Sequence, residues 1–124
     1  MGKFYKSNGE SISKEAIDRK DAKAKNEYSE EFLSENGYYF CERCKGNINQ
    51  CPGISRSHII SKKECQNTGR AELAYSKTNY ELLGDECHRD IENWSAHKRD
   101  SWYFERLNGV KFEDFIADFE NENP

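Results

Sequence analysis

The chain of 124 residues has no long apolar run. No stretch approaches the roughly 18 consecutive apolar residues that cross a bilayer as a helix. The first residues, Met-Gly-Lys-Phe-Tyr-Lys, also lack the apolar segment of a secretory signal peptide. These absences argue against a membrane partner and against export, so we expect a cytoplasmic protein.

Apolar residues as a whole are scarce. They make up 35% of the sequence, and charged residues make up 34%. This share is lean for a core that must stabilise a fold alone, and small chains often gain stability from a bound metal. The length predicts a single domain over residues 1–124, and the sequence contains no internal repeat or low-complexity tract.

A large charge of either sign is missing as well. The net charge is −4, which argues against a protein that coats DNA. The charge is nevertheless uneven, because residues 37–80 have a net charge of +4 and residues 81–124 have a net charge of −7. A local basic surface suits a partner with a phosphate backbone. The alternative is a chance fluctuation along the chain.

The five cysteines are an odd number, which fits a disulfide framework poorly. Thiols also stay reduced in the cytosol. Cys41 and Cys44 have the CxxC spacing that places two sulfur atoms on one tight turn. In that compartment such a pair is more often a metal-binding or redox element than a structural disulfide.

Helix signals are clearest near the N-terminus. Ser13 is a fair N-cap and good helix formers continue to Gly37, so we expect an N-terminal helix over residues 13–36. The apolar stripe of this helix is thin in the middle, which indicates that the helix needs a docking partner. Residues 1–12 are polar, and we expect them to be loose.

Shorter signals follow Gly37. Aromatic or alternating runs favour strands, and apolar residues at helical spacing favour helices. We expect strands at 38–40, 56–61 and 80–83, a helical turn at 62–67, one long helix from Glu86 to Leu107 capped by Asp85, and an amphipathic helix at 111–119.

One segment combines a cysteine pair with two histidines. In chain order it contains Cys41-Glu-Arg-Cys44, Ser57-His58, Asn79 and Cys87-His88-Arg-Asp-Ile-Glu92. Over residues 38–97 this order resembles the HNH nuclease family. The resemblance implies an α+β fold whose ββα-metal core carries a zinc knuckle. Here that core is flanked by the N-terminal helix and, at 98–124, by a C-terminal helical extension with an acidic tail.

The resemblance implies a structural zinc ion on Cys41, Cys44 and Cys87. Members with such a knuckle often supply a second CxxC, which would fall at positions 84 and 87, but position 84 is Gly. Cys51 or Cys65 can supply the fourth thiolate. We favour Cys51, because it follows the knuckle on a loop that can fold back. The alternative is a metal-free hairpin with buried thiols.

The resemblance also implies a catalytic set. His58 takes the position of the general base, and Asn79 that of a residue whose side chain bonds to loop backbone. His88 and Glu92, one helical turn apart, take the positions of ligands for a divalent ion such as Mg²⁺ or Mn²⁺. Ser57 stands where Asp or His commonly binds that ion, and a hydroxyl is a weaker ligand.

Together these residues predict an HNH-type DNA endonuclease or nickase, a class common in phages, so that the cell would be bacterial or phage-infected. Four basic residues around His58 are candidate phosphate contacts: Arg56, Lys62, Lys63 and Arg70. The alternative is a catalytically degenerate zinc module that binds nucleic acid or a protein, for which the flanking helices offer surfaces. A redox protein is disfavoured, because no helix follows the knuckle to lower a thiol pKa.

Overall fold

A computed structural model describes residues 3–122, with side chains described up to residue 118. Within these residues the fold has five α-helices and two small antiparallel sheets, so the expected mixture of α and β structure is confirmed. The elements, in chain order, are β1 (Lys3–Tyr5), β2 (Ser11–Ser13), α1 (Lys14–Asn36), β3 (Ser55–His58), α2 (Lys62–Asn67), the 3₁₀ helices η1 (Ala71–Tyr75) and η2 (Lys77–Asn79), β4 (Tyr80–Leu83), α3 (Asp85–Glu92), α4 (Ala96–Leu107) and α5 (Phe112–Glu122).

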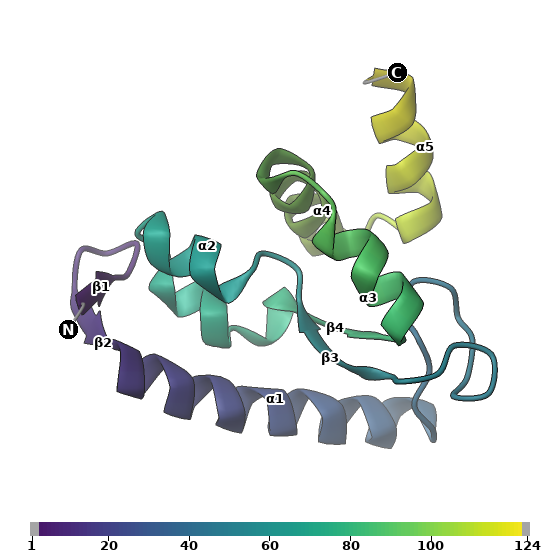
Figure 1. The fold of residues 1–124 in the computed structure, drawn as a ribbon, viewed down its shortest axis with the longest axis horizontal. Helices are drawn as coiled ribbons and strands as arrows, with labels where there is room; N and C mark the ends of the chain where they lie inside the picture. The colour runs from purple at the N-terminus through teal and green to yellow at the C-terminus, as the bar shows by residue number, and fades with distance from the viewer. Residues whose placement is uncertain (1–2, 123–124) are drawn as a thin grey trace.

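Helix α1 runs along one side of the molecule, beneath the other elements (Figure 1). The Ser13 side chain accepts a hydrogen bond from the Ala16 amide at 3.2 Å, which satisfies one of the free N–H groups of the first turn. At the other end Gly37 adopts φ of 82°, a left-handed conformation that costs glycine little, and its N–H caps the Leu33 carbonyl. Both predicted helix boundaries are therefore confirmed.

The N-terminal residues are not loose, contrary to expectation. Strands β1 and β2 form an antiparallel hairpin in which Phe4 is opposite Ile12. Both side chains are partly buried against the main hydrophobic cluster. Because each strand is only three residues long and has one partly buried side chain, at its central residue, the alternation is too short to stand out in the sequence.

The second sheet positions the site. Strands β3 and β4 pair antiparallel, with Ser57 opposite Glu81 and His58 opposite Tyr80. The prediction of a strand at 80–83 is correct, whereas the expected strand at 56–61 is shorter, because it ends at His58. Residues 38–40 form no strand; instead their aromatic rings gather near α1, where the Phe40 and Phe32 centroids are 4.9 Å apart.

The expected long helix from Glu86 to Leu107 is two helices, α3 and α4. Ser95 is the N-cap of the second helix, because its side-chain hydroxyl accepts a hydrogen bond from the Lys98 amide at 3.1 Å. Arg99 of α4 turns back and donates to the carbonyl oxygens of Ile91 and Glu92 at the end of α3. The residue preceding α3 is Gly84, so Asp85 is not the cap that was expected.

Two groups of buried residues hold these elements together. The larger group joins α1, α2, η1, α4 and α5 and includes Ile17, Ile60, Trp102 and Phe115. The smaller one surrounds Cys41, Cys51 and Cys87 and adds Leu83 and Ile91. In the part of the chain that the structure describes, no helix combines the length and the apolar character needed to cross a membrane.

Candidate functional site

Four cysteines form a candidate metal centre. The sulfur atoms of Cys41, Cys44, Cys51 and Cys87 all lie within 4.8 Å of one another. Four thiolates at such distances are the ligand set of a closed, tetrahedral structural zinc site. The predicted set, with Cys51 as the fourth member, is therefore brought together by the fold, and it could hold a zinc ion.

The first two cysteines sit on a tight turn. The Cys41 amide donates to the Gly46 carbonyl at 2.9 Å, and the Lys45 amide donates to the Cys41 carbonyl at 2.8 Å. Lys45 adopts φ of 65°, which is unusual for a residue with a side chain. This backbone reversal turns both sulfur atoms of the CxxC pair toward the same point.

Because Gly84 has no side chain, there is room for the Cys51 sulfur to complete the cluster. A Cβ atom at position 84 would overlap the Cys51 Sγ and would lie 2.7 Å from the Cys51 carbonyl oxygen. Position 84 is where the resemblance to HNH proteins predicts a further cysteine. Here the space beside residue 84 belongs to Cys51, so the fourth sulfur arrives from the 47–53 loop.

The surroundings of the four thiols differ. Burial opposes ionisation of Cys41, but hydrogen bonds from the backbone N–H groups of Cys44, Gly84 and Arg43 outweigh it and lower the pKa of its thiol to about 7. Burial raises the pKa of Cys51 to about 11, and it raises the pKa of Cys87 as well. Without a metal, Cys41 is therefore the first of these three to ionise, and a bound cation would favour ionisation of the others.

Cys65, the alternative fourth ligand, lies elsewhere. It is fully buried in the larger hydrophobic group, and its Sγ is 3.6 Å from the Ile60 carbonyl oxygen. Burial raises the pKa of its thiol. Cys65 is therefore a core residue of α2 and not a member of the cluster.

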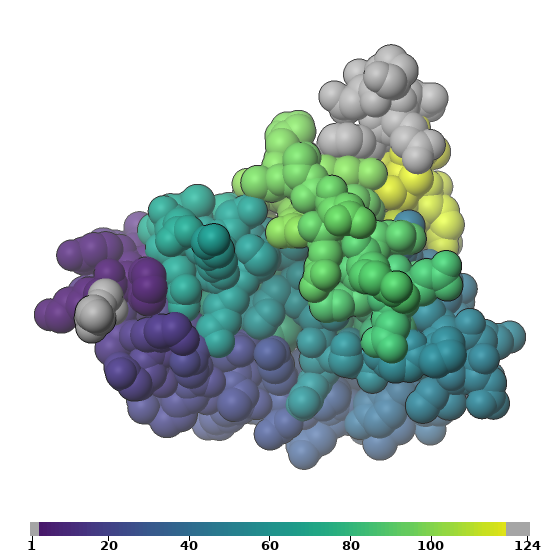
Figure 2. Space-filling view, viewed as in Figure 1, coloured from purple at the N-terminus to yellow at the C-terminus, as the bar shows by residue number. Residues whose placement is uncertain are grey.

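A second candidate site is a surface depression of about 190 Å³ next to the cysteine cluster. Its lining includes His58 from the end of β3 together with His88 and Glu92 from α3. The surface recedes between the teal atoms that include α2 and the green atoms of α3 and α4 (Figure 2). Three residues that the sequence singled out thus meet at one hollow, although they are far apart in the chain.

His88 and Glu92 lie on one face of α3. The His88 Nε2 is 3.4 Å from Glu92 Oε1, and the two side chains are 39% and 59% exposed. One imidazole nitrogen and one carboxylate oxygen form a donor pair that suits a divalent ion of intermediate hardness. Among the described residues, these two do not combine with a third ligand into a close cluster like that of the cysteines.

His58 is held by its Nε2 atom. This atom lies 2.9 Å from Asp21 Oδ1 and 2.8 Å from the Ala74 carbonyl oxygen. Both partners are acceptors, so Nε2 carries the hydrogen. In the neutral ring Nδ1 then has the lone pair, and the described residues provide no hydrogen bond to Nδ1.

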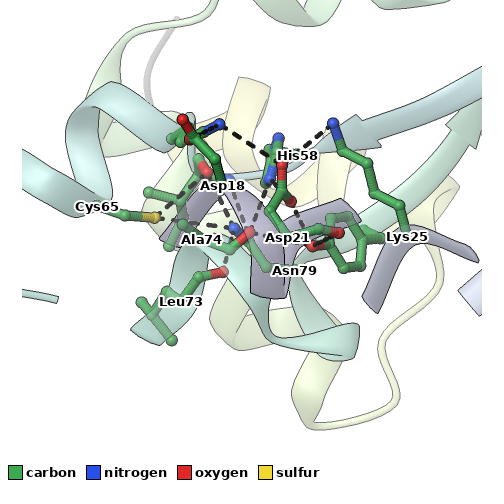
Figure 3. A network of polar contacts seen from close by, with 11 residues as sticks. Asp18, Asp21, Lys25, His58, Cys65, Leu73, Ala74 and Asn79 are labelled. Carbon is green, nitrogen blue, oxygen red and sulfur yellow. Dashed lines mark hydrogen bonds and ion pairs between the residues drawn. The ribbon is translucent and has the colours of Figure 1, made fainter. Parts of the chain in front are cut away.

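Asn79 fastens the segment that follows His58. Its side chain is fully buried. The Asn79 Oδ1 accepts from the Ile60 amide at 2.8 Å, while Nδ2 donates to the Ile60 carbonyl at 3.0 Å and to the Leu73 carbonyl at 2.9 Å. Figure 3 shows this group beside the Asp21–His58 contact. Asn79 therefore acts on backbone and does not reach the surface.

Ser57 is separate from the depression. Its side chain is 4% exposed, and its Oγ has no hydrogen-bond partner among the described residues. Successive side chains of a strand point to opposite faces. Ser57 therefore faces away from His58, toward its partner Glu81 in β4.

Three of the four candidate phosphate contacts already have partners in the fold. Lys62 is 2.6 Å from Asp18, Arg70 is 3.1 Å from Asp100, and Arg56 donates to Asn26 at 2.6 Å. Lys63 is exposed. Of the four, Lys62 is the one that lines the depression.

Two site residues were missed from the sequence. Asp21 holds His58, and Arg99 lines the depression from α4. Asp21 falls on the buried stripe of α1 with Ile17 and Ala24. A charged residue in an otherwise apolar stripe was therefore the signal in the sequence that could have identified Asp21. No such signal identified Arg99, because its position at the depression depends on the break between α3 and α4.

Comparison of the chain with protein-family models, with curated proteins and with solved structures finds no match. The geometry of the two sites is therefore what supports a function.

Proposed function

We propose that the chain is a metal-dependent nuclease of the HNH type that hydrolyses phosphodiester bonds of DNA. One observation carries this proposal: His58, His88 and Glu92 line the same surface depression. A general base and two ligands for a divalent ion are what hydrolysis of a phosphodiester requires within reach of one phosphate.

In this proposal His58 is the general base. Nε2 carries the hydrogen, so Nδ1 takes the proton of the water that attacks phosphorus. His88 and Glu92 would hold Mg²⁺ or Mn²⁺, which when bound polarises the phosphate and stabilises the leaving 3′ oxygen. Products then carry 5′-phosphate and 3′-hydroxyl ends.

The other residues have supporting roles. Lys62 and Arg99 line the same depression, where their positive charges suit a phosphate group. A zinc ion held by the cysteine cluster would anchor α3 through Cys87, one residue before His88. Asn79 fixes the backbone after His58. Each of these roles depends on the fold of this chain.

The test is cleavage of supercoiled plasmid DNA with Mg²⁺, with Mn²⁺ and without added divalent ion, after the zinc content of the protein has been verified. We expect nicking or linearisation that requires the added ion and disappears in His58→Ala. His97→Ala is the matched control, because His97 is an exposed histidine of α4 outside the depression. Intact plasmid with the wild-type protein under every condition would refute the proposal.

A second function is favoured by the position of Ser57. Ser57 stands where Asp or His commonly binds the divalent ion, but it is buried and lies opposite Glu81, so the ion would have one ligand fewer. The chain would then be a zinc module that binds nucleic acid or a protein without cutting. Salt-dependent DNA binding in the absence of cleavage would support this alternative.

A further inference from the structure

Asp21 is a buried carboxylate in the middle of α1. It is 4% exposed, although aspartate is among the residues least often buried. Its Oδ1 accepts from the Tyr80 hydroxyl at 2.6 Å and contacts His58 Nε2 at 2.9 Å. Its Oδ2 is 3.3 Å from Lys25 Nζ. The carboxylate therefore has charged or hydrogen-bonding partners at both oxygens (Figure 3).

These partners keep Asp21 ionised. Burial favours the protonated form, but the hydrogen bonds from His58 and Tyr80 and the nearby positive charge of Lys25 outweigh it and hold the pKa well below its usual range. A full negative charge thus lies beside Nε2 of the His58 ring. An imidazolium ion that formed at His58 would be stabilised by this charge.

The position of Asp21 relative to the ring is also significant. Only one nitrogen of His58 faces the carboxylate, and the same nitrogen faces the Ala74 carbonyl at 2.8 Å. A lone pair on Nε2 would face two acceptors and be repelled by both. The neutral ring is therefore restricted to the Nε2–H tautomer, in which Nδ1 is the basic atom.

We propose that Asp21 is the positioning residue of the site, a carboxylate that fixes the tautomer and orientation of His58 and stabilises its protonated form. This inference deepens the proposed nuclease function and rests on it for its catalytic consequence. During the reaction the proton of water moves to Nδ1, so that both ring nitrogens carry hydrogen, and Asp21 stays ionised. Helix α1, which lies outside the segment that resembles HNH proteins, is then part of the catalytic machinery.

The first test needs no change at Asp21 and no DNA cleavage. Long-range ¹H–¹⁵N correlation of the histidine rings, at a pH where His58 is neutral, identifies which nitrogen carries the hydrogen. The His58 signals are assigned by their loss in His58→Ala. We expect the Nε2–H tautomer, and a predominant Nδ1–H tautomer would overturn the inference.

The second test uses Asp21→Asn, which keeps the shape of the side chain and removes its charge. We expect single-turnover cleavage to slow by at least ~100-fold. The rate is measured at saturating protein, because Lys62 Nζ lies 3.7 Å from Asp21 Oδ2 and the substitution can change DNA affinity through Lys62. The Nδ1–H tautomer should also gain population, since only Ala74 then opposes it. Glu31→Gln is the control on the same helix, because Glu31 is exposed and pairs with Lys77.

The outcomes separate the two proposals. If wild-type protein has the Nε2–H tautomer but cuts no DNA, the positioning geometry stands and the nuclease function fails. If wild-type protein cuts DNA and Asp21→Asn cuts equally fast with an unchanged tautomer, the positioning role fails and the nuclease function stands. Should Asp21→Asn not fold, the tautomer of the wild-type ring still decides the inference.

Discussion

The sulfur atom of Cys51 fills the space in which a side chain at Gly84 would begin. A Cβ atom at Gly84 would overlap this sulfur and lie 2.7 Å from the Cys51 carbonyl oxygen. The fourth sulfur of the cluster and the absence of a side chain at position 84 are therefore one feature of the fold. A cysteine at 84 and a cysteine at 51 exclude each other.

Gly84→Ala should disrupt this arrangement. The added methyl group must displace Cys51, which moves its sulfur away from the cluster and overpacks the loop, so we expect a loss of about 1–3 kcal/mol of stability and weaker zinc binding. Urea unfolding in zinc-containing buffer measures the loss of stability, and competition with a chelating dye measures the zinc affinity.

In a Cys51→Ala background the same change should cost less stability, because only the contact with the Cys51 carbonyl remains. Zinc affinity equal to that of the wild type in Gly84→Ala would contradict the proposed place of Cys51.

The five cysteines offer a direct test of the ligand set. Purified protein should contain about one zinc ion per chain, as a closed four-thiolate site requires. Cys51→Ser should lose zinc and unfold at lower temperature, because metal binding contributes to folding free energy. Cys65→Ser should keep its zinc, since Cys65 is buried outside the cluster. Elemental analysis measures the zinc content of each variant, and a thermal melt measures its stability. Equal zinc loss in the two variants would exclude Cys51 as the fourth ligand.

Local signals explain which parts of the fold could be predicted. Ser13 and Gly37 bound α1, and the CxxC spacing identifies the knuckle, because each acts within a few residues of its own position. The choice of Cys51 over Cys65 also followed from its place on a nearby loop, and the fold brings Cys51 to the cluster.

Contacts between distant residues explain what could not be predicted. The β1–β2 hairpin depends on burying Phe4 and Ile12 against the main core. The break between α3 and α4 depends on Arg99, whose guanidinium satisfies carbonyl groups that a continuous helix would have used. Asp21 lies 37 positions before His58 in the sequence. Nothing in a local pattern identifies such a partner, apart from a charged residue on an otherwise buried helix face.

Glu81 should make stability depend on pH. Burial raises its pKa to about 7, and the nearby positive charge of Arg106 and the hydrogen bond from Trp102 only partly oppose this effect. The folded protein then holds a proton that the unfolded chain releases above its ordinary pKa of 4.5. Through Glu81, stability therefore falls as pH rises from about 4.5 to about 7 and stays lower above that window.

Glu81→Gln removes this dependence while keeping an oxygen that can accept from Trp102. Relative to wild type, the variant should gain stability across the same window, by as much as about 3 kcal/mol, since each pKa unit corresponds to about 1.4 kcal/mol. Denaturant unfolding of both proteins at several pH values gives the difference in their free energies of unfolding. Other titrating groups contribute equally to both proteins and cancel in this difference. A stability difference that does not change with pH would mean that folding does not raise the pKa of Glu81.

Arg99 provides a test of whether the depression beside His58 binds phosphate. Its guanidinium lines the depression while donating to the Glu92 carbonyl at 2.6 Å, so its charge is fixed close to His88 and Glu92. Arg99→Met should weaken DNA binding and reduce the salt dependence of the dissociation constant by about one charge. Arg89→Met removes the same charge from an exposed position on α3 outside the depression, and should leave the salt dependence nearly unchanged.

Binding is measured without added divalent ion, so that the DNA stays intact, and over a range of salt concentrations. Arg99→Met also removes hydrogen bonds between α3 and α4, so its melting temperature is recorded to establish that the folded protein is being compared. The decisive comparison is between the two methionine variants. Equal losses of affinity and of salt dependence would mean that DNA senses only the net charge of the protein, and that this depression does not hold a phosphate group.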